Sequence, residues 1–247
     1  MIVQHEHVDL ETPRGAMRTH VVRPVAPGRF PGVVFFSEIF QITDPIRRMA
    51  AFFAGHGYVV ALPEVFHEYA RPGEVFEYDQ AGSDRGNALK RLKPLPHYDA
   101  DTRAVLDHLV SRADCTGQLA ALGVCLGGHL AFRAAFQPDV LATACFYATD
   151  LHQASLGPDP EALTLGEAER IQGELLLVWG RQDPHVPQPG RRIVQERIDA
   201  LQIPCTWIEV DGAHAFLRDE GPRYDPELAH RLYGDVLGLL QRRLRAA

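Results

Sequence analysis

The sequence predicts an α/β fold: a mostly parallel sheet with helices on both faces and an antiparallel hairpin at its N-terminal end. Short apolar runs alternate along the chain with longer segments in which apolar residues recur at helical spacing. This alternation is typical of repeated strand–helix–strand units. The 247 residues contain no composition break, linker or internal repeat, so we expect one domain over residues 1–247.

The expected strands are short runs rich in Val, Leu, Phe and Ala. The first two form a hairpin, because Pro13, Arg14 and Gly15 are turn residues between two strand-like stretches. The later runs are almost continuously apolar, which indicates strands buried on both faces. The expected strands cover residues 8–10, 17–22, 32–36, 58–62, 119–124, 141–147, 175–179 and 206–210.

The expected helices begin at capping residues and carry apolar stripes. Asp44 as N-cap and Pro45 in the first turn predict one helix, which Gly55 and Gly57 close. We expect Asp99 to cap the next helix. The remaining features are the stripe Val105, Leu106, Leu109 and Val110 after Asp99, a helix over residues 126–137, a helix ending near Leu201, and a final stripe of Leu228, Leu232, Val236 and Leu240.

Two connections are long and polar, over residues 63–97 and 150–173. Long connections in a compact domain are often binding loops or lids, so we expect both to shape a pocket. In sheets of this kind, sites form at the carboxyl ends of the strands. The residues that directly follow each expected strand are therefore the candidates for function.

Composition excludes several classes of protein. Lys and Arg total 25 and Asp and Glu total 32, so the net charge of −7 argues against a nucleic-acid binder. No apolar run approaches the length of a membrane span, and residues 1–10 lack the apolar segment of a signal peptide. We therefore expect a cytoplasmic protein that binds neither nucleic acid nor membrane.

The four cysteines point to neither a disulfide scaffold nor a metal site. They form no C-x-x-C pair, and four cysteines are few for a chain of this length. No P-loop occurs, and a dinucleotide-binding G-x-G-x-x-G motif would need glycine where Cys125 stands. We expect no metal and no cofactor. Outside Cys125, the remaining cysteines are expected to be ordinary structural side chains: Cys115, Cys145 and Cys205.

The strongest chemical signal is the run Gly-Val-Cys-Leu-Gly-Gly at residues 123–128, between an expected strand and an expected helix. It has the G-x-S-x-G spacing of a nucleophile turn, with Cys125 in place of serine. The turn is so tight that positions two before and two after the nucleophile leave no room for side chains, which explains Gly123 and Gly127. At a helix N-terminus, backbone N–H groups and the helix dipole favour a thiolate.

A nucleophile needs a base, and the base needs a group that orients it. In this kind of fold the chain order is nucleophile, acid, histidine. Asp183 follows the strand at residues 175–179, and His214 follows the strand at residues 206–210. We expect Asp183 to orient His214, although the neighbouring His185 and Asp211 are rivals for these roles.

Another candidate group follows the strand at residues 32–36. Glu38 would lie partly buried at the edge of the site, because it comes directly after an apolar run. The backbone N–H groups of Ile39 and Leu126 are placed to form an oxyanion hole, one from this early loop and one from the residue after the nucleophile.

These residues together resemble the dienelactone hydrolase family, the carboxymethylenebutenolidases, which have the α/β-hydrolase fold. The resemblance covers the chain from about residue 30 to its C-terminal end. It rests on a cysteine in the nucleophile turn and on the following matches: Glu38-Ile39-Phe40, residues 123–128, Asp183 and His214-x-Phe216-x-Arg218.

The resemblance implies hydrolysis of an enol lactone through a thioester on Cys125, with His214 as base and then acid. In this family the glutamate, here Glu38, holds the thiol until substrate displaces it. The family binds the carboxylate of its small-molecule substrate with arginines, which suit a carboxylate because the guanidinium is a planar fork. Arg218 matches one of them, and Arg85 is the candidate for the other.

Two departures concern the substrate more than the reaction. Ala215 stands where type members of the family have serine after the histidine, and Phe66 stands where they have an aromatic hydroxyl residue. A carboxylesterase of wider scope and a thioesterase are therefore alternatives. A non-catalytic receptor with the same fold is a third, which the intact set of Cys125, Asp183 and His214 argues against.

Overall fold

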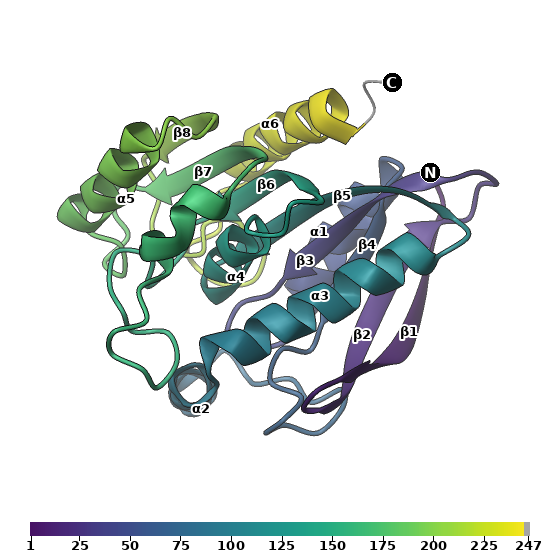
Figure 1. The fold of residues 1–247 in the computed structure, drawn as a ribbon, viewed down its shortest axis with the longest axis horizontal. Coiled ribbons are helices and arrows are strands. Elements are labelled where there is room, and N and C mark those ends of the chain that lie inside the picture. Colours follow the sequence, from purple (N-terminus) through teal and green to yellow (C-terminus); the bar gives the residue numbers. More distant parts are fainter. Residues whose placement is uncertain (245–247) are drawn as a thin grey trace.

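The computed structural model describes residues 1–244. Eight strands form one sheet in the order β1-β2-β4-β3-β5-β6-β7-β8 (Figure 1). β1 pairs antiparallel with β2, and β2 antiparallel with β4, while every other neighbouring pair is parallel. This confirms the predicted fold class and its N-terminal hairpin. The strands are β1 (Val3–Thr12), β2 (Gly15–Pro24), β3 (Phe30–Phe36), β4 (Val59–Pro63), β5 (Cys115–Val124), β6 (Val140–Phe146), β7 (Glu174–Gly180) and β8 (Cys205–Val210).

Helices cover both faces of the sheet. α3 and α4 contact each other and share β3 and β5, and they lie on the near face in Figure 1. α1 and α6 lie on the far face, where the rings of Phe52 and Tyr233 meet with centroids 4.9 Å apart. The helices are α1 (Asp44–Gly55), α2 (Gln80–Leu92), α3 (Leu95–Ser111), α4 (Leu126–Ala134), α5 (Gln188–Ala200) and α6 (Pro226–Leu244), with a 3-10 turn, η1 (Thr164–Arg170).

Two predicted helix starts are wrong. α1 is capped by Thr43, whose backbone is extended, and Asp44 is already helical. The Thr43 hydroxyl makes no capping bond, because it bonds the hydroxyl of Tyr78 at 2.7 Å. α3 begins at Leu95, ahead of the predicted Asp99 cap, because prolines suit the first turn of a helix. The carboxylate of Asp99 instead binds the guanidinium of Arg133.

α2 lies inside the long connection at residues 63–97 and was not predicted. It has no apolar stripe, because its two buried residues are glycines, Gly82 and Gly86. A Cβ on Gly86 would lie 2.5 Å from the carbonyl oxygen of Ile39. The helix therefore lies directly on the backbone of the loop that follows β3.

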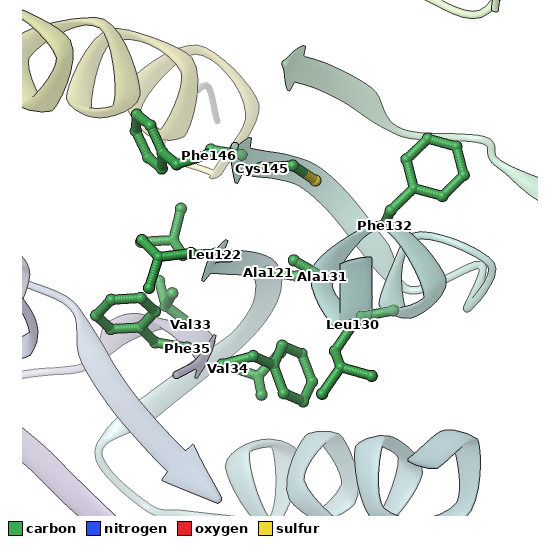
Figure 2. Close-up of a cluster of buried hydrophobic side chains, with 14 of the residues drawn as sticks. Val33, Val34, Phe35, Ala121, Leu122, Leu130, Ala131, Phe132, Cys145 and Phe146 are labelled. Atoms are coloured by element: carbon green, nitrogen blue, oxygen red, sulfur yellow. The ribbon is translucent and has the colours of Figure 1, made fainter. Parts of the chain in front are cut away.

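α4 is the most deeply buried helix and packs against the central strands of the sheet. All nine of its residues are buried. Figure 2 shows side chains of α4 gathered with those of β3, β5 and β6. The labelled members of this cluster are Val33, Val34, Phe35, Ala121, Leu122, Leu130, Ala131, Phe132, Cys145 and Phe146. This packing fixes the N-terminal end of α4 at the carboxyl ends of the parallel strands. Within residues 1–244, no helix is both long and apolar enough to cross a bilayer.

A pair of glycine substitutions tests the contact between α2 and Ile39. Alanine at Gly234 in α6 would meet no atom within 4 Å, so we expect it to stabilise the fold by up to about 1 kcal/mol through helix propensity. Alanine at Gly86 gains the same propensity but strikes the Ile39 carbonyl, so we expect a net loss of about 1–3 kcal/mol. Denaturant unfolding measures both, and equal changes in the free energy of unfolding would contradict the contact.

Candidate active site

Cys125 occupies a strained turn between β5 and α4. Its φ angle is +58°, in a region that non-glycine residues rarely adopt. Two hydrogen bonds hold the turn: the Cys125 N–H donates to the Phe146 carbonyl at 3.1 Å, and the Thr149 N–H donates to the Cys125 carbonyl at 3.3 Å. A strained residue held this way is often part of a functional site. The thiol therefore stands at the N-terminus of α4, as predicted.

The glycines of the turn are required by close packing of backbone on backbone. A Cβ on Gly123 would collide with the carbonyl of Gly127. A Cβ on Gly127 would collide with the carbonyl of Phe36, at the end of β3. The turn thus fits against the start of the loop that carries Glu38, and this brings the first and the central part of the chain together.

Asp183 and His214 meet as predicted. Asp183 lies in the loop after β7 and His214 in the loop after β8, and the two strands are parallel neighbours. The Asp183 Oδ2 lies 2.7 Å from the His214 Nδ1. The other oxygen of Asp183 accepts a hydrogen bond of 2.8 Å from the backbone N–H of His185. Both oxygens are occupied, so the carboxylate is fixed in one orientation.

Electrostatics favour the charged form of His214. Burial by itself lowers the pKa of this imidazole, but the charge of Cys125 and the hydrogen bond to Asp183 outweigh it and raise the pKa. Burial likewise raises the pKa of Asp183, and the bond to His214 reverses this, so that the net shift is downward. An imidazolium between a carboxylate and a thiolate is an arrangement that can generate a sulfur nucleophile.

The two rival residues lie differently. Asp211 is exposed and accepts a hydrogen bond of 2.8 Å from Gln182, so it does not orient His214. The ring of His185 lies edge-on to the ring of His214, with centroids 4.6 Å apart. His185 is exposed and is in contact with the imidazole of His214.

Glu38 is buried beside Arg218. Its Oε2 lies 3.6 Å from the Arg218 Nη1, longer than a hydrogen bond, and has no hydrogen-bond partner within residues 1–244. Burial raises the pKa of Glu38, against the lowering effect of Arg218 and of His214. A buried carboxylate oxygen without a hydrogen bond is energetically unfavourable. Another anion can therefore replace Glu38 beside Arg218.

Tyr78 completes the surroundings of Arg218, and the sequence did not single it out. The Arg218 guanidinium lies 4.1 Å from the centroid of the Tyr78 ring, a cation–π contact. Tyr78 also hydrogen-bonds Thr43. Tyr78 therefore links Arg218 to Thr43 at the start of α1.

Tyr147 is a second residue that sequence reasoning missed. It follows β6 directly, at a φ of +39°, and is fully buried. Its ring packs edge-on against His214, with centroids 5.1 Å apart, and its hydroxyl has no partner in the described chain. Its position directly after a strand could have indicated a site residue, but the sequence analysis included Tyr147 in the predicted strand because it continues the apolar run.

The two predicted oxyanion-hole residues have free donors. Ile39 follows Glu38 in the loop after β3, and Leu126 is the first residue of α4. Across residues 1–244, neither backbone N–H donates to another protein atom. Free donors at these two places are what an anion on a substrate oxygen needs.

Arg85 lies outside the cluster around Arg218. Its side chain is 47 % exposed, forms an ion pair of 2.6 Å with Glu74, and lies over the ring of Phe76. A role for Arg85 in substrate binding stays a prediction.

The clustered residues are almost inaccessible to solvent. Their exposed fractions are 9 % for Cys125, 8 % for Arg218, 6 % for His214, 3 % for Asp183 and 2 % for Glu38. Over the described range 1–244, no three His, Cys, Asp or Glu side chains are arranged to hold a metal ion.

Comparisons with known proteins agree with this geometry. The model of the dienelactone hydrolase family matches residues 17–244. A Saccharomyces cerevisiae protein with the provisional name carboxymethylenebutenolidase is 35% identical over 257 residues, covering 99% of this chain and 94% of the yeast protein. The carboxymethylenebutenolidase of Pseudomonas sp. (strain P51) is 26% identical over 230 residues, covering 92% of this chain and 91% of that protein.

A solved structure supports the fold. A protein of Klebsiella pneumoniae subsp. pneumoniae, provisionally assigned as a dienelactone hydrolase, superposes with a TM-score of 0.82 at 22% identity. The superposition covers 97% of this chain and 98% of that one. The resemblance that the motifs predicted is thus confirmed: this chain is a hydrolase that belongs to the dienelactone hydrolase family.

Proposed function

We propose that this protein hydrolyses a lactone or activated ester that carries a carboxylate, through a thioester on Cys125. The observation that carries the proposal is the strained turn of Cys125 beside the pair of His214 and Asp183, held at 2.7 Å. Each of these groups follows a different parallel strand, and the fold brings them together at one edge of the sheet.

The reaction takes place in two halves. The Cys125 thiolate attacks the carbonyl carbon, a C–S bond forms, and the C–O bond to the leaving group breaks. His214 gives its proton to the leaving oxygen. A water molecule then attacks the thioester, His214 takes the proton of that water, and the C–S bond breaks to release the acid and restore the Cys125 thiolate beside protonated His214.

The developing oxyanion is stabilised by two backbone donors. The N–H groups of Ile39 and Leu126 have no other protein acceptor and lie on either side of the nucleophile in the sequence. The positive end of α4 adds to this stabilisation. Loss of one such donor in other hydrolases reduces kcat by about 10²–10³.

Arg218 binds the carboxylate of the substrate. At rest it faces Glu38 at 3.6 Å, and Tyr78 fixes its guanidinium from one side. A substrate carboxylate competes with Glu38 for this guanidinium. The displaced Glu38 would then leave the vicinity of His214, whose charge lowers the pKa of Glu38.

The first test compares the wild type with Cys125→Ala on a dienelactone, followed by ultraviolet absorbance. We expect saturable turnover that the variant loses, and Cys205→Ala, in half-buried β8, is the matched control that keeps it. Turnover that survives in Cys125→Ala would contradict the proposal. Turnover of simple aryl esters or thioesters alone would move the assignment to a broader esterase or thioesterase, an alternative that the exposed, ion-paired Arg85 favours.

A second prediction concerns the orientation of His214. Asp183→Asn removes the carboxylate that bonds the Nδ1, so the pKa of His214 falls and kcat falls by about 10³–10⁴. The imidazolium of His214, followed by the NMR signals of its ring as pH is raised, is then lost at lower pH than in the wild type. Asp211→Asn, on the same loop as His214, is the control and leaves both quantities unchanged.

A third prediction concerns Tyr78. Tyr78→Ala removes the ring under Arg218, and we expect KM for a carboxylate-bearing ester to rise about tenfold, while KM for a neutral ester changes little. Tyr78→Phe keeps the ring and retains most of the affinity. Equal changes for charged and neutral esters in Tyr78→Ala would show that Tyr78 only supports the fold.

A further inference from the structure

His129 is a buried histidine of α4 that the reaction described above does not use. It lies one helical turn after Cys125. Its Nδ1 lies 2.9 Å from the carbonyl oxygen of Thr149, and its Nε2 lies 2.6 Å from the hydroxyl oxygen of Thr164. Both ring nitrogens are therefore engaged, one by the segment that follows β6 and the other by η1.

The partners of His129 fix which ring nitrogen carries the proton. Burial lowers the pKa of His129 to about 4, so the ring is neutral near pH 7 and donates from one nitrogen. A carbonyl oxygen only accepts, so the Nδ1–H donates to Thr149. The Nε2 then accepts from the hydroxyl of Thr164, which itself accepts a hydrogen bond of 3.1 Å from the guanidinium of Arg133.

These hydrogen bonds form a chain that begins at Arg133. Its buried guanidinium is held by two carboxylates, one on α3 and one on η1. The guanidinium donates to Thr164, the Thr164 hydroxyl to His129, and the imidazole to Thr149. The N–H of Thr149 then donates to the carbonyl of Cys125 at 3.3 Å. All four donors point the same way, and aligned hydrogen bonds strengthen one another.

The segment after β6 needs this anchor because its backbone is strained. Tyr147 and Asp150, which flank Thr149, have φ angles of +39° and +66°. The Thr149 hydroxyl has no hydrogen bond within residues 1–244, so the residue is held through its backbone. His129 binds the carbonyl of Thr149, and the carbonyl of Cys125 binds its N–H.

We propose that His129 is a positioning residue for the nucleophile: by holding Thr149, it keeps the Cys125 turn at its positive φ and the thiol at the N-terminus of α4. This rests on the proposed function, in which Cys125 is the nucleophile. The same segment carries Tyr147, whose ring packs against His214, so loss of the anchor disturbs both the nucleophile and its base.

The test measures kcat and KM for a dienelactone, with kcat expressed per reactive Cys125 counted by mass spectrometry after complete alkylation. His129→Leu removes the donor to Thr149 but keeps a buried apolar side chain. We expect kcat to fall about 10²-fold with KM little changed, because the nucleophile is misplaced while the binding groups remain. His129→Asn puts an amide N–H near the position of the Nδ1 and restores most of kcat.

Leu109→Ala is the control for a loss of stability alone. Leu109 is a fully buried residue of α3 that lies beside Gly32, near the start of β3 and so away from the strand ends that carry the site. We expect it to lower the Tm but not kcat per reactive Cys125. If His129→Leu likewise lowers only the Tm, or if His129→Asn restores nothing, His129 is merely structural and the proposal is overturned.

Two readouts do not depend on the substrate. Long-range ¹H–¹⁵N NMR of the His129 ring is expected to show a protonated Nδ1 and a bare Nε2, and the opposite tautomer would overturn the chain. If the wild type does not hydrolyse the lactone, the proposed function fails, and the rate at which iodoacetamide alkylates Cys125 decides the role of His129. A rate about tenfold lower in His129→Leu than in Leu109→Ala supports the proposal, and equal rates overturn it.

Discussion

The tight turn at Cys125 is the constraint on which the rest of the site depends. A positive φ at a residue with a side chain is unfavourable. Here it is maintained by hydrogen bonds to Phe146 at the end of β6 and from Thr149 beyond it, and by glycine backbones packed against β3. The same packing sets where the loops after β3 and β6 begin. Because those loops carry Glu38, Ile39 and Tyr147, one steric requirement places both the nucleophile and the groups around it.

Charge balance is the second organising feature. The buried site holds two cationic groups, His214 and Arg218, and each faces a carboxylate, at 2.7 and 3.6 Å respectively. The first pair is tight and oriented, which suits a permanent role. The second is loose, and one of its carboxylate oxygens has no hydrogen bond in the described chain, which suits exchange with an incoming anion. The tight pair of His214 and Asp183 therefore suits the chemical step, and the loose pair of Arg218 and Glu38 suits recognition of the substrate.

The parts of this site that sequence could predict are those with a local steric or positional cause. Gly123 and Gly127 could be interpreted because only glycine fits the turn, and Asp183 and His214 because each follows an apolar strand. The helix α2 could not be predicted, because a surface helix that packs through glycines has no apolar periodicity. Tyr78 could not be predicted either, because its role depends on its contacts with Arg218 and Thr43. The prediction that Asp99 caps a helix was wrong for a similar reason, because its hydrogen-bond partner Arg133 is distant in sequence. Long-range polar contacts leave no periodic trace.

The measurement that tests the central claim most directly is mass spectrometry of the protein quenched in acid during turnover of a slow aryl ester. The account predicts a mass increase equal to the acyl group, located on the peptide that contains Cys125 and removed by hydroxylamine. An acyl group on a different residue, or steady turnover with no acyl group on Cys125 even when water attack is slow, would contradict the thioester mechanism.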